Sequence, residues 1–330
     1  MEHVKFGRTG LQVSRLCLGT MTFGLQCDEA RSVAILDAAA EAGIDFLDTA
    51  DIYPLGGDWR SAGATEEIVG RWLKGKRHKH IVATKCAGPM GPEAWNRGAS
   101  RKHILAAIDG SLRRLGTDYV DLYQLHFYDP LTPLDETLEA LDAVVRSGKA
   151  RYVGVSNWPA YKVALALGIS QANRLVRIDS VQPRYNLLFR TLERELLALC
   201  GEEDVALIPY NPLAGGLLTG KHARGAPPAE GRFNLGRAGS LYQERYWHDN
   251  QFEAVEVLRG LAAEADMSLA TMAVRWVLSH PAVTAPIIGA SRPEQLADSI
   301  AAAEQGPLPA ELKGRLDELT HGFRAIDADR

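Results

Sequence analysis

The sequence predicts an α/β fold of the (β/α)8, or TIM-barrel, class, and three observations support it. Short segments rich in Val, Ile and Leu alternate along the chain with longer segments of helical periodicity. Eight short segments occur, and the stretches between them are long enough to cross back over a sheet. No G-x-G-x-x-G motif follows the first segment, which argues against an open dinucleotide-binding sheet.

The expected elements follow in order. Strands are predicted over residues 15–19, 44–48, 80–85, 119–126, 152–157, 178–182, 206–211 and 285–289. Capping residues predict three helix limits: residues 28–42 stop at Gly43, a helix capped by Ser100 stops at Gly116, and residues 133–147 stop at Gly148. Ahead of the first strand, residues 3–14 alternate around the turn GRTG and predict a β-hairpin that closes the bottom of the barrel. We expect residues 1–330 to form one domain with long loops at the carboxyl ends of the strands, over residues 53–65, 87–100 and 213–250.

Composition limits the classes of function. The 330 residues are 46% hydrophobic and 24% charged, as in ordinary globular proteins. A net charge of −4, from 37 basic and 41 acidic residues, favours a small-molecule partner over nucleic acid or an anionic membrane.

We find no leader-like start and no apolar run long enough to span a bilayer, so a cytoplasmic location is expected. The four scattered cysteines predict reduced thiols, with Cys86 beside Lys85 more typical of a core residue than of a reactive one.

Polar residues stand at the ends of successive predicted strands, where the loops of a barrel converge on one mouth. They are Asp48, Lys85, His126, Asn157 and Gln182, with Tyr53 and Tyr210 close by. An acid, a lysine, a histidine and a tyrosine at one mouth are typical of an acid–base site. His126 has no spaced histidine partners, so no metal site is expected.

Two chemistries remain open for Lys85. It could form a Schiff base, as in class I aldolases. Alternatively, its fixed charge could lower the pKa of Tyr53 and make the phenol a proton donor near neutral pH. In that case Asp48 would hold Lys85 charged, and a neutral His126 would orient a substrate carbonyl.

The segments FLDTADIY, TKC, LYQLH and GVSN resemble those of the aldo-keto reductase superfamily, in order and spacing, over nearly the whole chain. The similarity is to bacterial reductases of the channel-β-subunit-like and general-stress types. The resemblance implies a nicotinamide-dependent carbonyl reductase whose catalytic tetrad is Asp48, Tyr53, Lys85 and His126, with Asp51 only a loop acid. Channel-associated members of the superfamily leave a third alternative, a subunit that senses the nucleotide.

A cofactor site is expected at the same mouth. Ser156, Asn157 and Gln182 offer polar groups for a carboxamide, and Tyr210 offers a stacking ring. The segment from Gly215 to Lys221 nearly matches a phosphate-binding loop, but His222 replaces the required hydroxyl. The family's use of this loop implies a pyrophosphate site. Its expected residues are Leu213, Gly216, Lys221 and Arg232.

The end of the chain predicts the second phosphate. Ser291 and Glu294 form a capping-box pattern, and Arg292 beside it suits the 2′-phosphate that distinguishes NADPH from NADH. The resemblance assigns Gln295 and Asp298 to the phosphate and adenine, with Ser299 in place of the usual Asn. The other expected cofactor contacts are Gly19, Thr20, Met21, Asp48, Asn211, Pro212 and Gly289.

Aromatic residues in strand-end loops predict an apolar or ring-bearing carbonyl substrate. They are Phe23, Trp59, Trp95, Phe127, Tyr128 and Trp158. Arg60 and Arg97 give only a weak indication of an anionic substrate. The loop over residues 224–250 is expected to close over bound cofactor.

Overall fold

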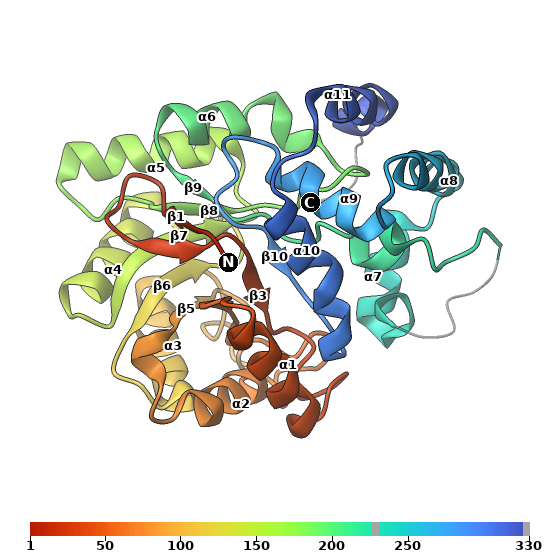
Figure 1. Cartoon of the computed structure of the whole chain (residues 1–330). Coiled ribbons are helices and arrows are strands. Elements are labelled where there is room, and N and C mark those ends of the chain that lie inside the picture. Colours follow the sequence, from red (N-terminus) through yellow and green to blue (C-terminus); the bar gives the residue numbers. More distant parts are fainter. Residues whose placement is uncertain (226–230, 326–330) are drawn as a thin grey trace.

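The computed structural model describes residues 1–225 and 231–325, and its centre is one parallel eight-stranded sheet curled into a barrel (Figure 1). The strands follow the order β10-β3-β4-β5-β6-β7-β8-β9. Two isolated parallel bridges, Leu207 with Val283 and Tyr210 with Ile287, join the two edges. The predicted (β/α)8 class is therefore confirmed.

The strands of the barrel are mostly short. Their bounds are β3 Cys17–Gly19, β4 Phe46–Asp48, β5 Ile81–Cys86, β6 Val120–Leu125, β7 Ala150–Ser156, β8 Ser180–Gln182, β9 Ala206–Leu207 and β10 Ile287–Ile288. β9 and β10 are shorter than predicted. Pro209 and Pro286 lie within the two predicted segments, and a proline has no N–H to donate to a sheet.

Helices alternate with the strands and surround the barrel (Figure 1). The α-helices are α1 Glu29–Glu41, α2 Ala64–Leu73, α3 Arg101–Leu115, α4 Leu134–Arg146, α5 Ala160–Asn173, α6 Leu196–Glu202, α7 Gly236–Tyr246, α8 Asp249–Glu264, α9 Leu269–Leu278, α10 Ala297–Gln305 and α11 Ala310–Leu319. Short 3-10 helices are η1 Arg77–Lys79, η2 Thr191–Arg194, η3 Ala214–Thr219, η4 Arg232–Asn234, η5 Pro293–Leu296 and η6 His321–Arg324.

The three predicted helix limits agree with α1, α3 and α4, and side chains cap the first two of these helices. The Asp28 carboxylate accepts a hydrogen bond from the Arg31 amide at 2.8 Å, and the Ser100 hydroxyl accepts one from the His103 amide at 3.3 Å. α3 ends at Gly116, whose φ of 63° is the left-handed conformation that glycine adopts without strain.

The hairpin of β1 (His3–Lys5) and β2 (Gln12–Ser14) closes one end of the barrel, as predicted. Phe6 and Val13 are fully buried among side chains of the barrel interior, and the Phe6 ring meets that of Phe46 edge-on at 5.9 Å. A second, larger apolar cluster fills the space between strands and helices. A functional site is therefore expected at the opposite end of the barrel, where the parallel strands end.

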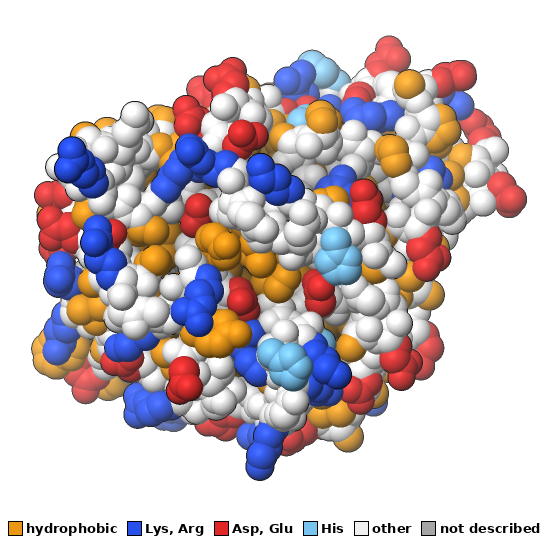
Figure 2. All heavy atoms as spheres, turned by 60° about the vertical axis from the view of Figure 1, so that its left-hand side comes forward, with side chains coloured by type: hydrophobic (Ala, Val, Ile, Leu, Met, Phe, Trp, Pro, Cys, Tyr) orange, Lys and Arg blue, Asp and Glu red, His pale blue; other side chains and the backbone are white. Residues whose placement is uncertain are grey.

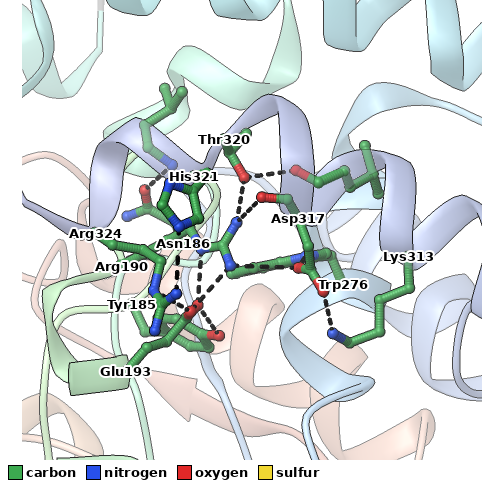
Figure 3. A network of polar contacts seen from close by, with 12 residues as sticks. Tyr185, Asn186, Arg190, Glu193, Trp276, Lys313, Asp317, Thr320, His321 and Arg324 are labelled. Carbon is green, nitrogen blue, oxygen red and sulfur yellow. Dashed lines mark hydrogen bonds and ion pairs between the residues drawn. The ribbon is translucent and has the colours of Figure 1, made fainter. Parts of the chain in front are cut away.

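A polar network fastens α11 to the chain that follows β8 (Figure 3). The buried Arg190 guanidinium donates to both carboxylate oxygens of Glu193, to the Asp317 carbonyl and to the Thr320 hydroxyl, at 2.7–2.9 Å. Asp317 also accepts a hydrogen bond from the Trp276 indole at 2.8 Å. The C-terminal helix is thus held in a fixed place beside the barrel.

Charges of both signs are interspersed on the face shown in Figure 2. No helix among residues 1–225 and 231–325 combines the length and the apolar character that crossing a membrane demands. All four cysteines are buried and free. Burial raises the pKa of the Cys86 thiol despite the neighbouring Lys85, which supports its interpretation as a core residue.

Candidate active site

A cavity of about 760 Å³ opens at the carboxyl ends of the strands. Asp48, Tyr53 and His126 line it, while Lys85 lies directly beneath with 0% of its surface exposed. Asp48 ends β4, Lys85 lies near the end of β5, and His126 follows β6. The parallel register brings these residues together because every strand finishes at the same rim.

Asp48 is the centre of a buried hydrogen-bond network. Its carboxylate accepts from the Lys85 ammonium at 2.5 Å, from the Gln182 amide at 3.0 Å and from the Gln124 amide at 3.1 Å. The Thr49 carbonyl accepts a further bond from Lys85 at 2.9 Å. The ammonium therefore has a compensating charge and a fixed position.

Gln124 was not predicted as a site residue. It is fully buried in β6, two residues before His126, so both side chains point to the same face of the strand. In the segment YVDLYQLH, Gln124 stands two residues before the candidate His126, and this strand spacing is the signal that would have found it.

Tyr53 lies where the Lys85 charge acts on its hydroxyl. The phenolic oxygen is 3.4 Å from the Lys85 ammonium nitrogen, and the ring meets the His126 ring edge-on at 5.6 Å. Burial nevertheless raises the pKa of Tyr53 above its ordinary value, because the lowering by Lys85 does not outweigh it and the charge of Asp48 adds to the rise. The expected lowering of this pKa is wrong for the protein without cofactor.

The pKa values of Lys85 and His126 are shifted in opposite directions. Burial by itself lowers the pKa of Lys85, but the Asp48 charge and the Tyr53 hydroxyl outweigh it, so the pKa lies above its ordinary value. Burial lowers the pKa of His126 well below its ordinary value, and the charge of Lys85 lowers it further. At neutral pH the site therefore holds a charged lysine, a neutral histidine and a protonated tyrosine.

Asp51 is not the solvated loop acid that was expected. It is fully buried, and burial raises its pKa well above the ordinary value, with the Glu66 carboxylate acting in the same direction. Glu66 is itself buried, where it accepts hydrogen bonds from the Thr84 hydroxyl at 2.5 Å and from Arg114 at 2.7 Å. This buried group of polar side chains supports the loop that carries Tyr53. The residue types alone did not predict that the group is buried.

The predicted cofactor residues converge on the cavity, with one exception. Nearly all of them line it: Gly19, Thr20, Met21, Asp48, Ser156, Asn157, Gln182, Tyr210, Asn211, Pro212, Leu213, Gly216, Lys221, Arg232, Gly289, Ser291, Arg292, Gln295 and Asp298. Ser299 is buried within α10 and does not reach the cavity. Their roles stay predictions, because lining a cavity does not show what a residue binds.

The ring of Tyr210, predicted to stack on a nicotinamide, is held in place by a hydrogen bond at its hydroxyl. The Tyr210 hydroxyl donates to the Asn157 amide oxygen at 2.8 Å, and the Asn157 amide nitrogen donates to the His126 carbonyl at 3.1 Å. The Ser156 hydroxyl donates to the Gln182 carbonyl at 2.8 Å. These bonds couple the position of Tyr210 to the loop that carries His126.

Three observations fit a dinucleotide. Asn211 lines the cavity, and its buried amide nitrogen has no hydrogen-bond partner in the described chain, so one donor of this wall is unsatisfied. A Cβ atom at position 19 would lie 2.7 Å from the Ile287 side chain, so a residue larger than glycine would clash in this wall of the cavity. Lys221, Arg232 and Arg292 line the cavity, and among the described residues none of the three forms an ion pair.

One sequence interpretation near these cations is wrong. Ser291 does not cap a helix: its amide and hydroxyl both donate to the Gln295 side chain, at 2.8 and 3.1 Å, and the helical segment starts as η5 without a side-chain cap. The near-match to a phosphate-binding loop, against which His222 already argued, is not realised in the structure. It falls in η3, where Gly215 and Gly216 have positive φ, rather than between a strand and an α-helix.

The structure brings only part of the aromatic set to the cavity. Trp59 and Phe127 line it and are 42% and 43% exposed. Phe23 is fully buried in the core, and Trp95 is exposed outside the cavity. Trp158 packs edge-on against Tyr128 at 5.2 Å and faces a different cavity. Sequence position placed all these residues in loops near the rim but did not fix the direction of their side chains.

The long loop after β9 covers one side of the cavity. Leu241, Tyr242 and Arg245 of α7 contribute to its wall. Residues 226–230, which belong to the segment expected to close over the cofactor, lie outside the described residues. Within the described ranges, no group of three or more His, Cys, Asp or Glu side chains is arranged to hold a metal ion.

The fold and the site together define a class: a barrel enzyme with an acid–base centre beside a cavity suited to a nucleotide cofactor. The Aldo/keto reductase family model matches residues 15–321. The chain belongs to the aldo/keto reductase family and is an NAD(P)H-dependent oxidoreductase.

Curated relatives cover almost the full length. The "Uncharacterized oxidoreductase YrpG" of Bacillus subtilis is 40% identical, over 92% of this chain and 91% of its own. The "Probable voltage-gated potassium channel subunit beta" of Oryza sativa is 37% identical, over 93% of each chain. "Protein tas" of Escherichia coli is 36% identical, over 91% of this chain and 92% of its own.

Proposed function

We propose that this enzyme uses NADPH to reduce an aldehyde or ketone to an alcohol, with Tyr53 as the proton donor. The observation that carries the proposal is the Tyr53 hydroxyl, 3.4 Å from the buried Lys85 ammonium and beside the His126 ring, on the cavity wall. The reaction is reversible, so the same groups would also serve alcohol oxidation.

The bound nicotinamide would supply the hydride. Tyr53 stays protonated at rest because its pKa is raised, so it can donate. As the carbonyl oxygen gains charge it becomes a much stronger base than a phenolate, and the proton moves to it from the Tyr53 oxygen. The Lys85 ammonium stabilises the phenolate that is left, and Asp48 keeps Lys85 charged and in position.

His126 would orient the substrate. Because its pKa is lowered well below the ordinary value, the ring is neutral and can donate a hydrogen bond to a carbonyl oxygen without adding charge. Trp59 and Phe127 give the entrance an apolar surface, which supports an apolar or ring-bearing carbonyl compound as substrate.

The decisive experiment replaces Tyr53 by Phe. Reduction of a broad panel of aldehydes and ketones should fall by about a hundredfold or more, which is the usual contribution of a general acid, while NADPH binding measured by fluorescence changes little. Tyr161→Phe is the matched control, since its ring is exposed and lies outside the cavity. Retained turnover in Tyr53→Phe would refute the proton-donor role.

Residues of the cavity would hold the cofactor along its length. Tyr210 would stack on the nicotinamide, Asn157 and Gln182 would contact its carboxamide, and Lys221 and Arg232 would face the pyrophosphate. Arg292 would bind the 2′-phosphate and favour NADPH over NADH.

Replacing Arg292 by Ala tests this assignment. The dissociation constant for NADPH should rise by about tenfold or more, while that for NADH stays nearly constant, because only NADPH carries the phosphate. Arg113→Ala, on the outer face of α3, serves as control. Equal changes for both nucleotides would place the phosphate elsewhere.

Two alternatives predict different results. A Schiff-base aldolase needs a neutral Lys85, whereas this amine is buried against Asp48 with a raised pKa, and borohydride with substrate should trap no adduct. A nucleotide-sensing subunit is favoured by the name of the rice relative. It would bind NADPH tightly with negligible turnover across the carbonyl panel.

A further inference from the structure

A second cavity, of about 380 Å³, lies behind the ring of Tyr210. Asn157, Tyr210 and Arg245 line both this cavity and the larger one, so they form the wall between the two. The aromatic and apolar side chains of Trp158, Phe189 and Leu192 line it from other directions. The proposed reduction does not use this space.

A buried cation faces this second cavity. Arg184 follows β8, is 5% exposed, and forms no ion pair or hydrogen bond with its guanidinium in the described chain. Its Nη1 atom is buried without a partner. The guanidinium lies 3.5 Å from the centre of the Phe189 ring, a contact that offsets only part of the cost of burying a charge.

Two further arginines add positive charge around the second cavity. Arg245 also lines the cavity, and its buried Nε atom has no partner in the described residues. Arg194 lines the outer part and is exposed. Glu195 is the carboxylate among the lining side chains, but it is exposed and pairs with none of the three arginines. Among residues 1–225 and 231–325, the positive charge of this cavity is therefore uncompensated, and it lies above apolar walls.

The wall that carries Arg184 is held in place on two sides. Asn186 donates hydrogen bonds to the Asn211 carbonyl at 2.9 Å and to the Tyr246 hydroxyl at 3.0 Å. Further along, the network of Arg190, Glu193 and Asp317 fixes the same segment to α11 (Figure 3). Arg184 is thus preorganised rather than free to turn out to solvent.

We propose that this second cavity binds a small organic anion, a carboxylate or phosphate on an apolar or aromatic body. The anionic group would accept hydrogen bonds from the guanidinium groups of Arg184 and Arg245, both of which line the cavity. Its apolar body would lie against Trp158 and Leu192. The ligand would contact the face of Tyr210 that belongs to the second cavity. This inference does not depend on the reductase reaction.

Calorimetric titration of the full chain without cofactor tests the site. Benzoate is the probe, and benzyl alcohol, which has the same ring without the charge, is its matched control. We expect benzoate to bind with one-to-one stoichiometry and benzyl alcohol to bind at least about tenfold more weakly, because only the carboxylate satisfies the arginines.

Variants locate the binding. Arg184→Met should weaken benzoate binding by about tenfold or more, and Arg184→Gln should weaken it similarly, which keeps the test valid if one variant fails to fold. Arg245 lines both cavities, so its replacement would not tell them apart. Arg113→Met is the control for loss of a positive charge. Trp59→Ala, which alters only the larger cavity, should leave benzoate affinity unchanged.

Three results would overturn the proposal. They are the absence of benzoate binding, equal binding of benzoate and benzyl alcohol, or a benzoate affinity that depends on Trp59 and not on Arg184. The last result would place the anion in the larger cavity. Loss of turnover in Tyr53→Phe would not bear on any of these readouts.

Discussion

Replacing Asp48 by Asn should destabilise the protein through Lys85. The two side chains are 4% and 0% exposed and lie 2.5 Å apart, so the pair is fully removed from water. Without the carboxylate, the buried ammonium keeps only the Thr49 carbonyl, the Tyr53 hydroxyl and a neutral amide as neighbours. Breaking a buried pair in this way costs about 3–5 kcal/mol of unfolding free energy.

The pH dependence gives this prediction a sign. In the wild type the pKa of Lys85 is raised above its unfolded value, so the lysine stabilises the fold below that value and the stabilisation disappears as pH rises through the folded pKa. In Asp48→Asn, burial dominates and lowers the folded pKa below the unfolded one. The ammonium then costs stability near neutral pH, and the cost shrinks as pH approaches about 10.4.

Urea unfolding of both proteins between about pH 7 and pH 10 measures the effect. The difference in unfolding free energy should be largest at the lower pH and should narrow as pH rises. Glu29→Gln is the control, because that carboxylate belongs to a half-exposed ion pair with Arg71 and its loss should hardly move the midpoint. A deficit below about 1 kcal/mol with no dependence on pH would show that the Asp48–Lys85 pair does not support the fold.

Two other predictions concern the C-terminal network and the histidine. Arg190→Met should lower the unfolding free energy by about 3 kcal/mol, measured by urea titration, because Glu193 and Asp317 lose their buried cation and keep only the more exposed Arg324 and Lys313. Arg315→Met, in a half-exposed pair, should not lower it, and equal losses would contradict the argument. The His126 ring should show no proton titration by NMR between about pH 6 and pH 8, because its pKa is lowered well below 6.5; a midpoint near 6.5 would mean that the ring is not buried beside a cation.

The barrel could be predicted because its signals are local and repeated. Apolar segments of strand length, separated by helices, recur around the whole sheet, and Asp28 and Ser100 cap two of the three helices whose limits were expected. The errors in predicting strand lengths and the Ser291 cap arose where a single residue changes the local structure. Pro209 and Pro286 shorten β9 and β10, and the Gln295 side chain occupies the groups of Ser291 that a cap would use.

The site was predictable in its membership and less so in its orientations. Strand ends fix where a side chain starts, so Asp48, Lys85 and His126 could be placed at one rim from order alone. A loop residue such as Trp158 or Phe23 has no such constraint, and both turned away from the cavity. Which charged side chains are buried and which are paired depends on residues far apart in the sequence. The burial of Asp51, and the lack of an ion pair at Arg184 among the described residues, therefore become visible only in the structure.

The raised pKa of Tyr53 explains how the four groups can work together. Asp48 neutralises much of the Lys85 field at rest, so the phenol keeps its proton while the cavity waits for substrate. A lowered resting pKa is not needed, because catalysis depends on how much better the reacting state is stabilised than the resting one. In the proposed reaction, the phenolate left by proton donation would lie 3.4 Å from an ammonium that is already buried and held by Asp48 and Thr49. Such a fixed cation needs no reorganisation during the reaction, and this makes its charge more effective than that of a mobile surface lysine.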